Sequence, residues 1–150
     1  SNTLEERKIF AQETDIMIEK IHNKGAEAAL YMIHAYVEPH EDTNPNMIKD
    51  IKKMYIDVAN KNKVLVMPVG IAFENAYMEK PKIQLHKHYD GTHPSLLGTY
   101  LASAVVFSSI THMSPKNIKY NYFDAIDDSD IEFLQKIAHE TVEDFFGIDL

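Results

Sequence analysis

The chain has 150 residues, of which 45% are apolar, a formal net charge of −8 and no cysteine. This length and composition predict a single domain over residues 1–150 with its own hydrophobic core. The acidic balance without a Lys/Arg-rich run gives no basis for nucleic-acid or anionic-membrane partners, and the lack of cysteine excludes disulfides, a thiolate nucleophile and cysteine-ligated metals.

The first predicted element is an amphipathic helix. Thr3 and Glu6 have the spacing of a capping box, in which each side chain bonds the other residue's backbone N–H. Apolar residues then recur at helical spacing over Leu4–Asn23, and Gly25 follows the expected end. No apolar run in the chain reaches membrane-spanning length, so no membrane partner is expected.

Two short apolar runs are predicted to be strands. Residues 28–36 and 64–70 are apolar on both alternating faces, which is typical of strands covered on both sides of a parallel sheet. Between them, Pro45 is expected to open a helix that ends near Lys63. After the second run, residues 71–78 are predicted to form a short helix or turn.

The most informative stretch follows residues 83–88. Asp90-Gly91-Thr92-His93 is a turn sequence, and Pro94 is expected to begin a helix that continues to about Thr111, with His93 near its cap. This helix has a broad apolar face, and Gly98 is expected to allow a close backbone approach. The pattern therefore places an imidazole and a carboxylate at a helix entrance.

The remaining chain predicts one more helix. Residues 120–123 are expected to be extended, Ser129 and Glu132 form a second apparent capping box, and Gly147 ends the last helix. The element order favours α/β packing with parallel strands. Two strands make a narrow sheet with unpaired edges, so further sheet is expected from a second copy or from a missing segment.

The run Asp90-Gly91-Thr92-His93-Pro94-Ser95, followed by an apolar helix from Leu97, resembles the final block of the SGNH (GDSL-type) esterase and lipase superfamily, whose signature there is Asp-x-x-His. Residues 30–36, 67–72 and 134–142 are similar in content and order to the later part of a bacterial SGNH-like branch. The resemblance covers nearly the whole chain.

This resemblance implies a three-layer α/β/α flavodoxin-like fold with a parallel sheet and ester hydrolysis by Ser-His-Asp chemistry, without cofactor or metal. Matching by motif, Asp90 is the orienting carboxylate and His93 the general base. The substrate would be a small ester or an acylated carbohydrate. The family's Gly-Asp-Ser-Leu and Gly-x-Asn-Asp blocks do not occur, so the chain corresponds to a truncated carboxyl-terminal part. We expect it to be inactive alone, and a full-length parent could be periplasmic or secreted.

Other interpretations of these residues remain open. Asp90 and His93 could form only a structural turn and cap, and Ser95 is better explained as a first-turn hydroxyl than as a nucleophile. Ser1 is terminal and is a still weaker nucleophile candidate. The competing functional class is a catalytically inactive module that dimerises through its sheet edge.

The other histidines allow two hypotheses. His86 and His88, together with His93 and Asp90, could bind a divalent metal, although histidines in a loop before a helix are more often solvated. His34 lies where ligands bind in open α/β sheets, but a hydrogen-bonded structural role is commoner.

Overall fold

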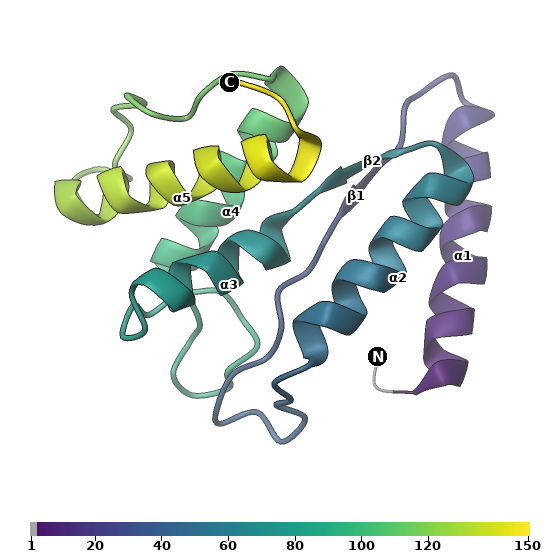
Figure 1. Ribbon diagram of the computed structural model, residues 1–150, viewed down its shortest axis with the longest axis horizontal. Coiled ribbons are helices and arrows are strands. Elements are labelled where there is room, and N and C mark those ends of the chain that lie inside the picture. The colour runs from purple at the N-terminus through teal and green to yellow at the C-terminus, as the bar shows by residue number, and fades with distance from the viewer. Residues whose placement is uncertain (1–2) are drawn as a thin grey trace.

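The structure, a computed structural model, describes residues 3–150. In chain order its elements are α1 (Leu4–His22), β1 (Ala29–Tyr31), α2 (Met47–Asn62), β2 (Leu65–Met67), α3 (Val69–Glu79), α4 (Leu96–Thr111) and α5 (Asp128–Phe146). More than half of the residues are helical. In Figure 1 the two strands lie between α1 and α2 on one side and α3, α4 and α5 on the other.

The sheet is much smaller than the sequence predicted. β1 and β2 pair in parallel over three residues each, from Ala29 opposite Leu65 to Tyr31 opposite Met67, and the described residues contain no further strand. The three-layer α/β/α flavodoxin-like fold is therefore wrong for this chain. Only three residues of each apolar run enter the strand ladder. Over residues 28–36 burial alternates, with Ala28, Met32 and His34 buried and Ala29, Tyr31 and Ile33 exposed, so this segment is not covered on both faces as predicted.

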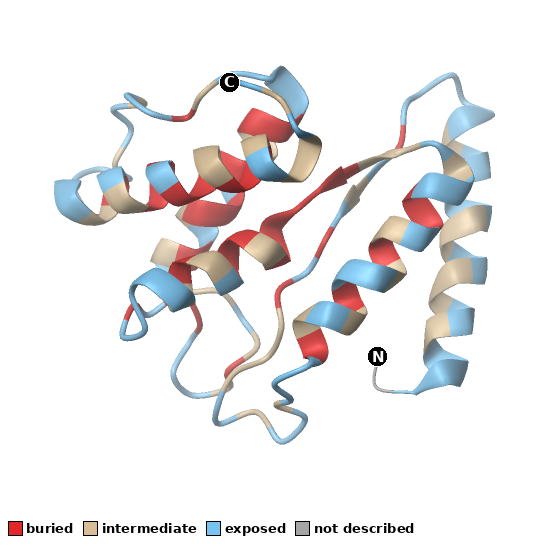
Figure 2. Cartoon of the chain, viewed as in Figure 1, coloured by how far each residue is buried: buried red, intermediate tan, exposed pale blue. Residues whose placement is uncertain are grey.

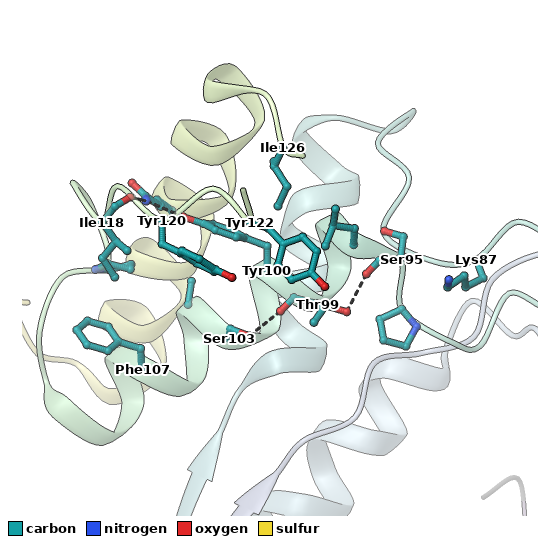
Figure 3. Close-up of a pocket in the computed structure, with 15 residues that line it drawn as sticks. Lys87, Ser95, Thr99, Tyr100, Ser103, Phe107, Ile118, Tyr120, Tyr122 and Ile126 are labelled. Carbon is teal, nitrogen blue, oxygen red and sulfur yellow. Dashed lines mark hydrogen bonds between the residues drawn. The ribbon is translucent and has the colours of Figure 1, made fainter. Parts of the chain in front are cut away.

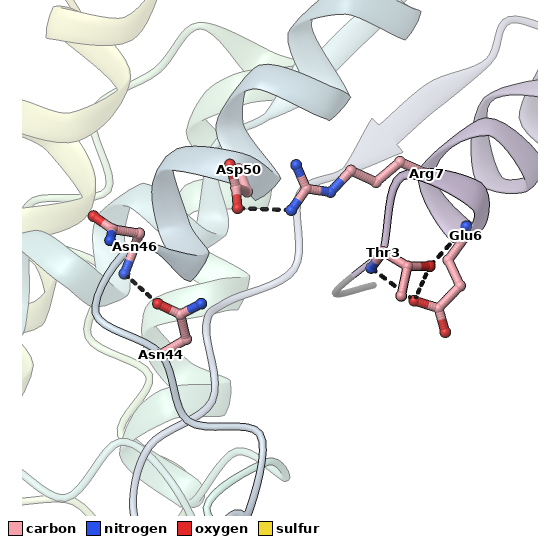
Figure 4. A network of polar contacts seen from close by, with 6 residues as sticks. All are labelled: Thr3, Glu6, Arg7, Asn44, Asn46 and Asp50. Carbon is pink, nitrogen blue, oxygen red and sulfur yellow. Dashed lines mark hydrogen bonds and ion pairs between the residues drawn. The ribbon is translucent and has the colours of Figure 1, made fainter.

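The first helix is fixed by its predicted cap and by contacts with α2. The Thr3 side chain accepts from the Glu6 backbone N–H, and the Glu6 carboxylate accepts from the Thr3 N–H at 3.0 Å, which confirms the capping box (Figure 4). Arg7 donates to Asp50 of α2 at 2.7 Å. Lys61, near the end of α2, pairs with Asp15 in the second half of α1. Two charged pairs thus join the two helices.

The hydrophobic core has two parts, which appear as buried faces of the helices in Figure 2. One part is formed mainly by α3, α4 and α5, and the other by α2, the strands and residues packed against them. Gly98 lets α4 approach the chain closely, because an added Cβ would lie 2.1 Å from the carbonyl oxygen of Leu85. This confirms the expected close approach.

Two predicted helix starts are corrected. α4 begins at Leu96 with Ser95 as its N-cap, not at Pro94. α5 begins after Asp127, so Ser129 lies inside the helix and the second capping box is wrong.

The 120–123 segment is not extended. Tyr122, Phe123 and Asp124 have φ values of 56°, 58° and 62°, so this part of the chain is a left-handed turn. Both the side chain of Asp124 and its backbone N–H bond to the Asn121 amide, at 2.7 and 3.0 Å, and these bonds brace the turn.

Candidate functional site

Asp90 and His93 are in direct contact, as their spacing suggested. His93 Nδ1 lies 2.9 Å from Asp90 Oδ2. The other carboxylate oxygen, Oδ1, accepts from the backbone N–H groups of Thr92 at 2.9 Å and His93 at 3.0 Å. The His93 side chain is 73% exposed and that of Asp90 only 23%. The carboxylate thus holds one ring nitrogen while the rest of the imidazole faces solvent.

The same bonds keep Asp90 ionised. Partial desolvation raises the pKa of this carboxyl, but the two backbone N–H groups and the His93 ring outweigh it and lower the pKa to about 2. Asp90 is therefore an anion at neutral pH. A neutral His93 then carries its proton on Nδ1, because Oδ2 can only accept, and Nε2 is left as an acceptor.

Main-chain contacts position this turn. Gly91 has φ +65°, and a Cβ added to it would lie 1.9 Å from the carbonyl oxygen of Val37. The Gly91 carbonyl accepts from the Val37 N–H at 2.9 Å, and the His93 carbonyl accepts from the Lys87 N–H at 2.7 Å. The turn is therefore pressed against the loop that follows β1, where only glycine fits.

Ser95 has a structural role. Its Oγ donates to the Gln84 carbonyl at 2.6 Å and accepts from the Gly98 N–H at 3.1 Å. The second bond is the N-cap bond of α4, and the first ties the cap to the preceding segment, which agrees with the predicted structural hydroxyl rather than with a nucleophile.

A buried network lies between α3 and the loop after β1. Tyr77 Oη is 2.7 Å from His86 Nδ1, and His86 Nε2 is 2.9 Å from His34 Nδ1 and 3.1 Å from the Ala35 carbonyl oxygen. The His34 ring stacks on Phe73 with centroids 4.5 Å apart. His34 thus has the structural role expected for it. His86 is buried rather than solvated, which corrects that expectation.

The bonding pattern fixes the proton positions in this network. The Ala35 carbonyl can only accept, so His86 Nε2 carries the hydrogen and His86 Nδ1 accepts from the Tyr77 hydroxyl. Desolvation, together with the neighbouring His34, lowers the pKa of His86 to about 4, and desolvation also lowers the pKa of His34. Both rings are therefore neutral at pH 7.

Tyr77 and His86 border a cavity of about 330 Å³ at the carboxyl ends of the two strands. The loop after β1 contributes Glu38, and α3 contributes Gly70 from its first turn and Glu74 from its middle. Open α/β sheets bind ligands at this end of their strands. The cavity is thus in the expected place for a ligand, with two carboxylates in its lining.

The metal hypothesis gains no support from the geometry. Within residues 3–150 there is no group of three or more His, Asp or Glu side chains arranged to hold a metal ion. His86 bonds inside the core, whereas His88 is exposed.

Among the described helices, none is long and apolar enough to cross a bilayer.

A larger cleft of about 610 Å³ begins beside the Asp90–His93 turn. Lys87, Pro94 and Ser95 line it there, and it continues along α4 beneath the segment that joins α4 to α5 (Figure 3). Tyr120 and Tyr122 of that segment face α4 in this view. The lining contains no carboxylate.

Sequence reasoning missed this cleft and the Tyr77–His86 contact. Residues Asp90 and His93 are three positions apart, so a local motif could reveal them. Tyr77 and His34 are brought to His86 from α3 and from the end of β1, and only the tertiary fold joins them. The sequence signal was a histidine in each of two segments that also contain strongly apolar residues, 28–36 and 83–88.

Comparison with known proteins yields a fold relationship. No protein-family model and no curated protein matches the sequence. The chain is similar in structure to a DUF4886 family protein from Bacteroides uniformis, with a TM-score of 0.69 and 20% sequence identity. The match covers 78% of this chain and 48% of that protein, so the chain spans about half of its neighbour's length. At this identity the two proteins share a fold, and nothing about activity follows.

Proposed function

We propose that Asp90 and His93 are the orienting carboxylate and the general base of an ester hydrolase of the SGNH type, acting on a small ester or an acylated carbohydrate. The observation that carries the proposal is the 2.9 Å contact between His93 Nδ1 and Asp90 Oδ2, with most of the imidazole exposed. An imidazole oriented on one nitrogen and open on the other is the arrangement that hydroxyl activation requires.

In the proposed reaction, His93 Nε2 takes the proton of an attacking hydroxyl as its oxygen bonds to the ester carbonyl carbon. His93 then returns that proton to the departing alcohol, and water repeats the cycle to release the acid. The ionised Asp90 stabilises the transient imidazolium, because its pKa of about 2 keeps it charged throughout. In this reaction His93 transfers the proton and Asp90 orients the His93 ring.

The attacking hydroxyl has to come from another polypeptide segment. The nearest serine in sequence, Ser95, has both donor and acceptor functions of its hydroxyl engaged in the α4 cap. No hydrogen bond to His93 Nε2 occurs among residues 3–150. We therefore expect this chain alone to show no measurable hydrolysis of a small activated ester such as p-nitrophenyl acetate.

The test uses the longest polypeptide that the reading frame of this sequence encodes. Asp90→Asn and His93→Gln should each lower kcat/KM for p-nitrophenyl esters by about 10²- to 10⁴-fold, because orientation and proton transfer are lost. His88→Gln is the matched control, since His88 is an exposed histidine of the same loop, and it should retain activity. If Asp90→Asn and His93→Gln hydrolyse the ester as fast as His88→Gln and the wild type do, the proposal is wrong.

A second candidate function is a non-enzymatic module that associates through the free edge of β1. Tyr31 of β1 and Ile33, two residues beyond the strand, are 39% and 38% exposed, and β1 pairs only with β2 within the described chain. An open apolar edge can accept another strand. Sedimentation of the purified chain tests this: a dimer that Ile33→Lys converts to a monomer supports the module, and a monomer at all concentrations refutes it.

A further inference from the structure

We infer that the cleft along α4 binds the acyl chain of the substrate and retains the released acid, a medium-chain fatty acid whose carboxylate pairs with Lys87. The inference rests on the proposed ester hydrolysis for its place in the reaction. Binding itself needs no turnover and can be measured separately. At about 610 Å³ the cleft is within the range of about 300–1,000 Å³ usual for small-molecule sites.

The cleft starts where the acyl group would be released. Lys87 and Pro94 lie at the end next to His93, and the Lys87 backbone N–H donates to the His93 carbonyl at 2.7 Å. Phe107 and Ile118 lie at the other end in Figure 3. A chain released at His93 can thus lie along α4 with its carboxylate near Lys87 and its methyl end among apolar side chains.

The outer wall of the cleft is held by a buried side chain of α5. The Gln135 amide donates to Tyr100 Oη at 2.9 Å and to the Ile118 carbonyl at 2.7 Å, and Gln135 Oε1 accepts from the Asn117 N–H at 3.2 Å. Gln135 is almost fully buried. The wall is therefore built into the α4–α5 packing.

The rim carries aromatic rings on a strained backbone. Tyr120, Tyr122 and Phe123 form an edge-to-face cluster with centroids 5.9–6.4 Å apart, although all three side chains are largely exposed. Tyr122 and Phe123 have the left-handed φ values that disfavour aromatic residues. Strained exposed aromatics beside an apolar cleft are a feature of ligand sites rather than of stability.

Charge selects an anionic ligand. Lys87 is the only charged residue in the lining, in a chain whose net charge is −8. Within residues 3–150 its ammonium takes part in none of the ion pairs. A fatty acid matches this distribution, because one carboxylate meets one ammonium and the apolar chain meets the apolar lining.

Decanoate and the uncharged decanol are titrated into the purified chain by calorimetry at low salt. Ser103→Trp should weaken both by at least about tenfold, because this exposed α4 residue lies in the cleft and tryptophan would fill it. Lys87→Met should weaken decanoate by up to about fivefold and leave decanol unchanged, as expected for an exposed ion pair.

Two matched controls accompany these variants. Ile110→Trp adds the same ring to an exposed α4 position outside the lining, and Lys82→Met removes an exposed lysine elsewhere, so both should bind as the wild type does. Tyr122→Gly should weaken decanoate yet raise the urea midpoint, because glycine relieves the positive φ. A purely structural tyrosine would not give this combination.

Three results would overturn the inference: no decanoate binding, equal binding by Ser103→Trp and the wild type, or a dimer that Ser103→Trp dissociates without a change in decanoate affinity. The last result would make the cleft an interface between copies. In the longest encoded polypeptide, intact decanoate binding without ester hydrolysis would remove the proposed function alone. Hydrolysis unaffected by Ser103→Trp would remove only this inference.

Discussion

The two histidine regions of this protein use opposite environments. His93 is largely exposed, bonded to an ionised carboxylate and positioned by main-chain contacts. His34 and His86 are buried, neutral and positioned by side-chain hydrogen bonds. Desolvation lowers the pKa of both buried rings, so this pair resists protonation. The difference shows that one imidazole is open to solvent, whereas the other two are held inside the core.

The largest expected effect tests how the exposed region is positioned. Gly91→Ala should lower the free energy of unfolding by about 3 kcal/mol or more, because it adds left-handed strain and a clash with the Val37 carbonyl. Gly25→Ala is the control, since Gly25 has a similar φ of +75° but nothing within 4 Å, and it should lose only about 1 kcal/mol. Urea unfolding measures both. Equal losses would show that the main chain does not position the turn.

The next effect is a pH dependence that belongs to the buried region. The folded pKa of His86, about 4, lies below its ordinary value of 6.5, so the unfolded chain binds the proton first. Stability from this group is complete above pH 6.5 and falls by about 3 kcal/mol as the pH drops to 4. Asp90 acts in a separate pH window: its lowered pKa contributes stability above pH 3.8, and this contribution is lost as the pH falls from 3.8 to about 2.

Urea unfolding at pH 7.5 and pH 4.5 separates these contributions. His86→Gln should flatten the dependence above pH 4.5, while His88→Gln, which changes an exposed ring, should leave it as in the wild type. A wild-type stability that stays constant over this range would mean that the buried histidines are not kept neutral.

The smallest effect concerns one hydrogen bond of the buried region. Tyr77→Phe removes the donor to His86 Nδ1 and leaves a buried acceptor without its partner, so unfolding should become easier by about 1–3 kcal/mol. Tyr89→Phe alters an exposed tyrosine and should stay within about 0.5 kcal/mol of the wild type. If both variants unfold alike, Tyr77 does not support the network.

Local patterns in the sequence were good predictors of this structure. The Thr3–Glu6 capping box and the helix-ending Gly147 depend on neighbouring residues, and both were predicted. Asp90 and His93 were found for the same reason, and their contact is visible in the structure, while their catalytic role stays a prediction.

Long-range features were beyond the sequence. The apolar runs 28–36 and 64–70 have the composition of central strands, yet each contributes only three residues to the sheet and Ala29, Tyr31 and Ile33 of the first run are exposed, so the sheet was predicted too large. The pairing of His34 with His86 spans 52 positions and depends on how the segment between α3 and α4 packs against the loop after β1. Likewise, the left-handed turn at Tyr122 replaces a predicted extended segment, because side-chain bonds within the loop outweigh aromatic strand preference.

The contact between Val37 and Gly91 is made by backbone atoms, and this affects how far the sequence around it can diverge. Its hydrogen bond uses a backbone N–H and a backbone carbonyl, and its close contact involves a glycine and another carbonyl. Every side chain of the loop over residues 35–38 could therefore change in related proteins without displacing the imidazole. Divergent relatives could retain the placement of this ring while sharing little besides the glycine, the aspartate and the histidine.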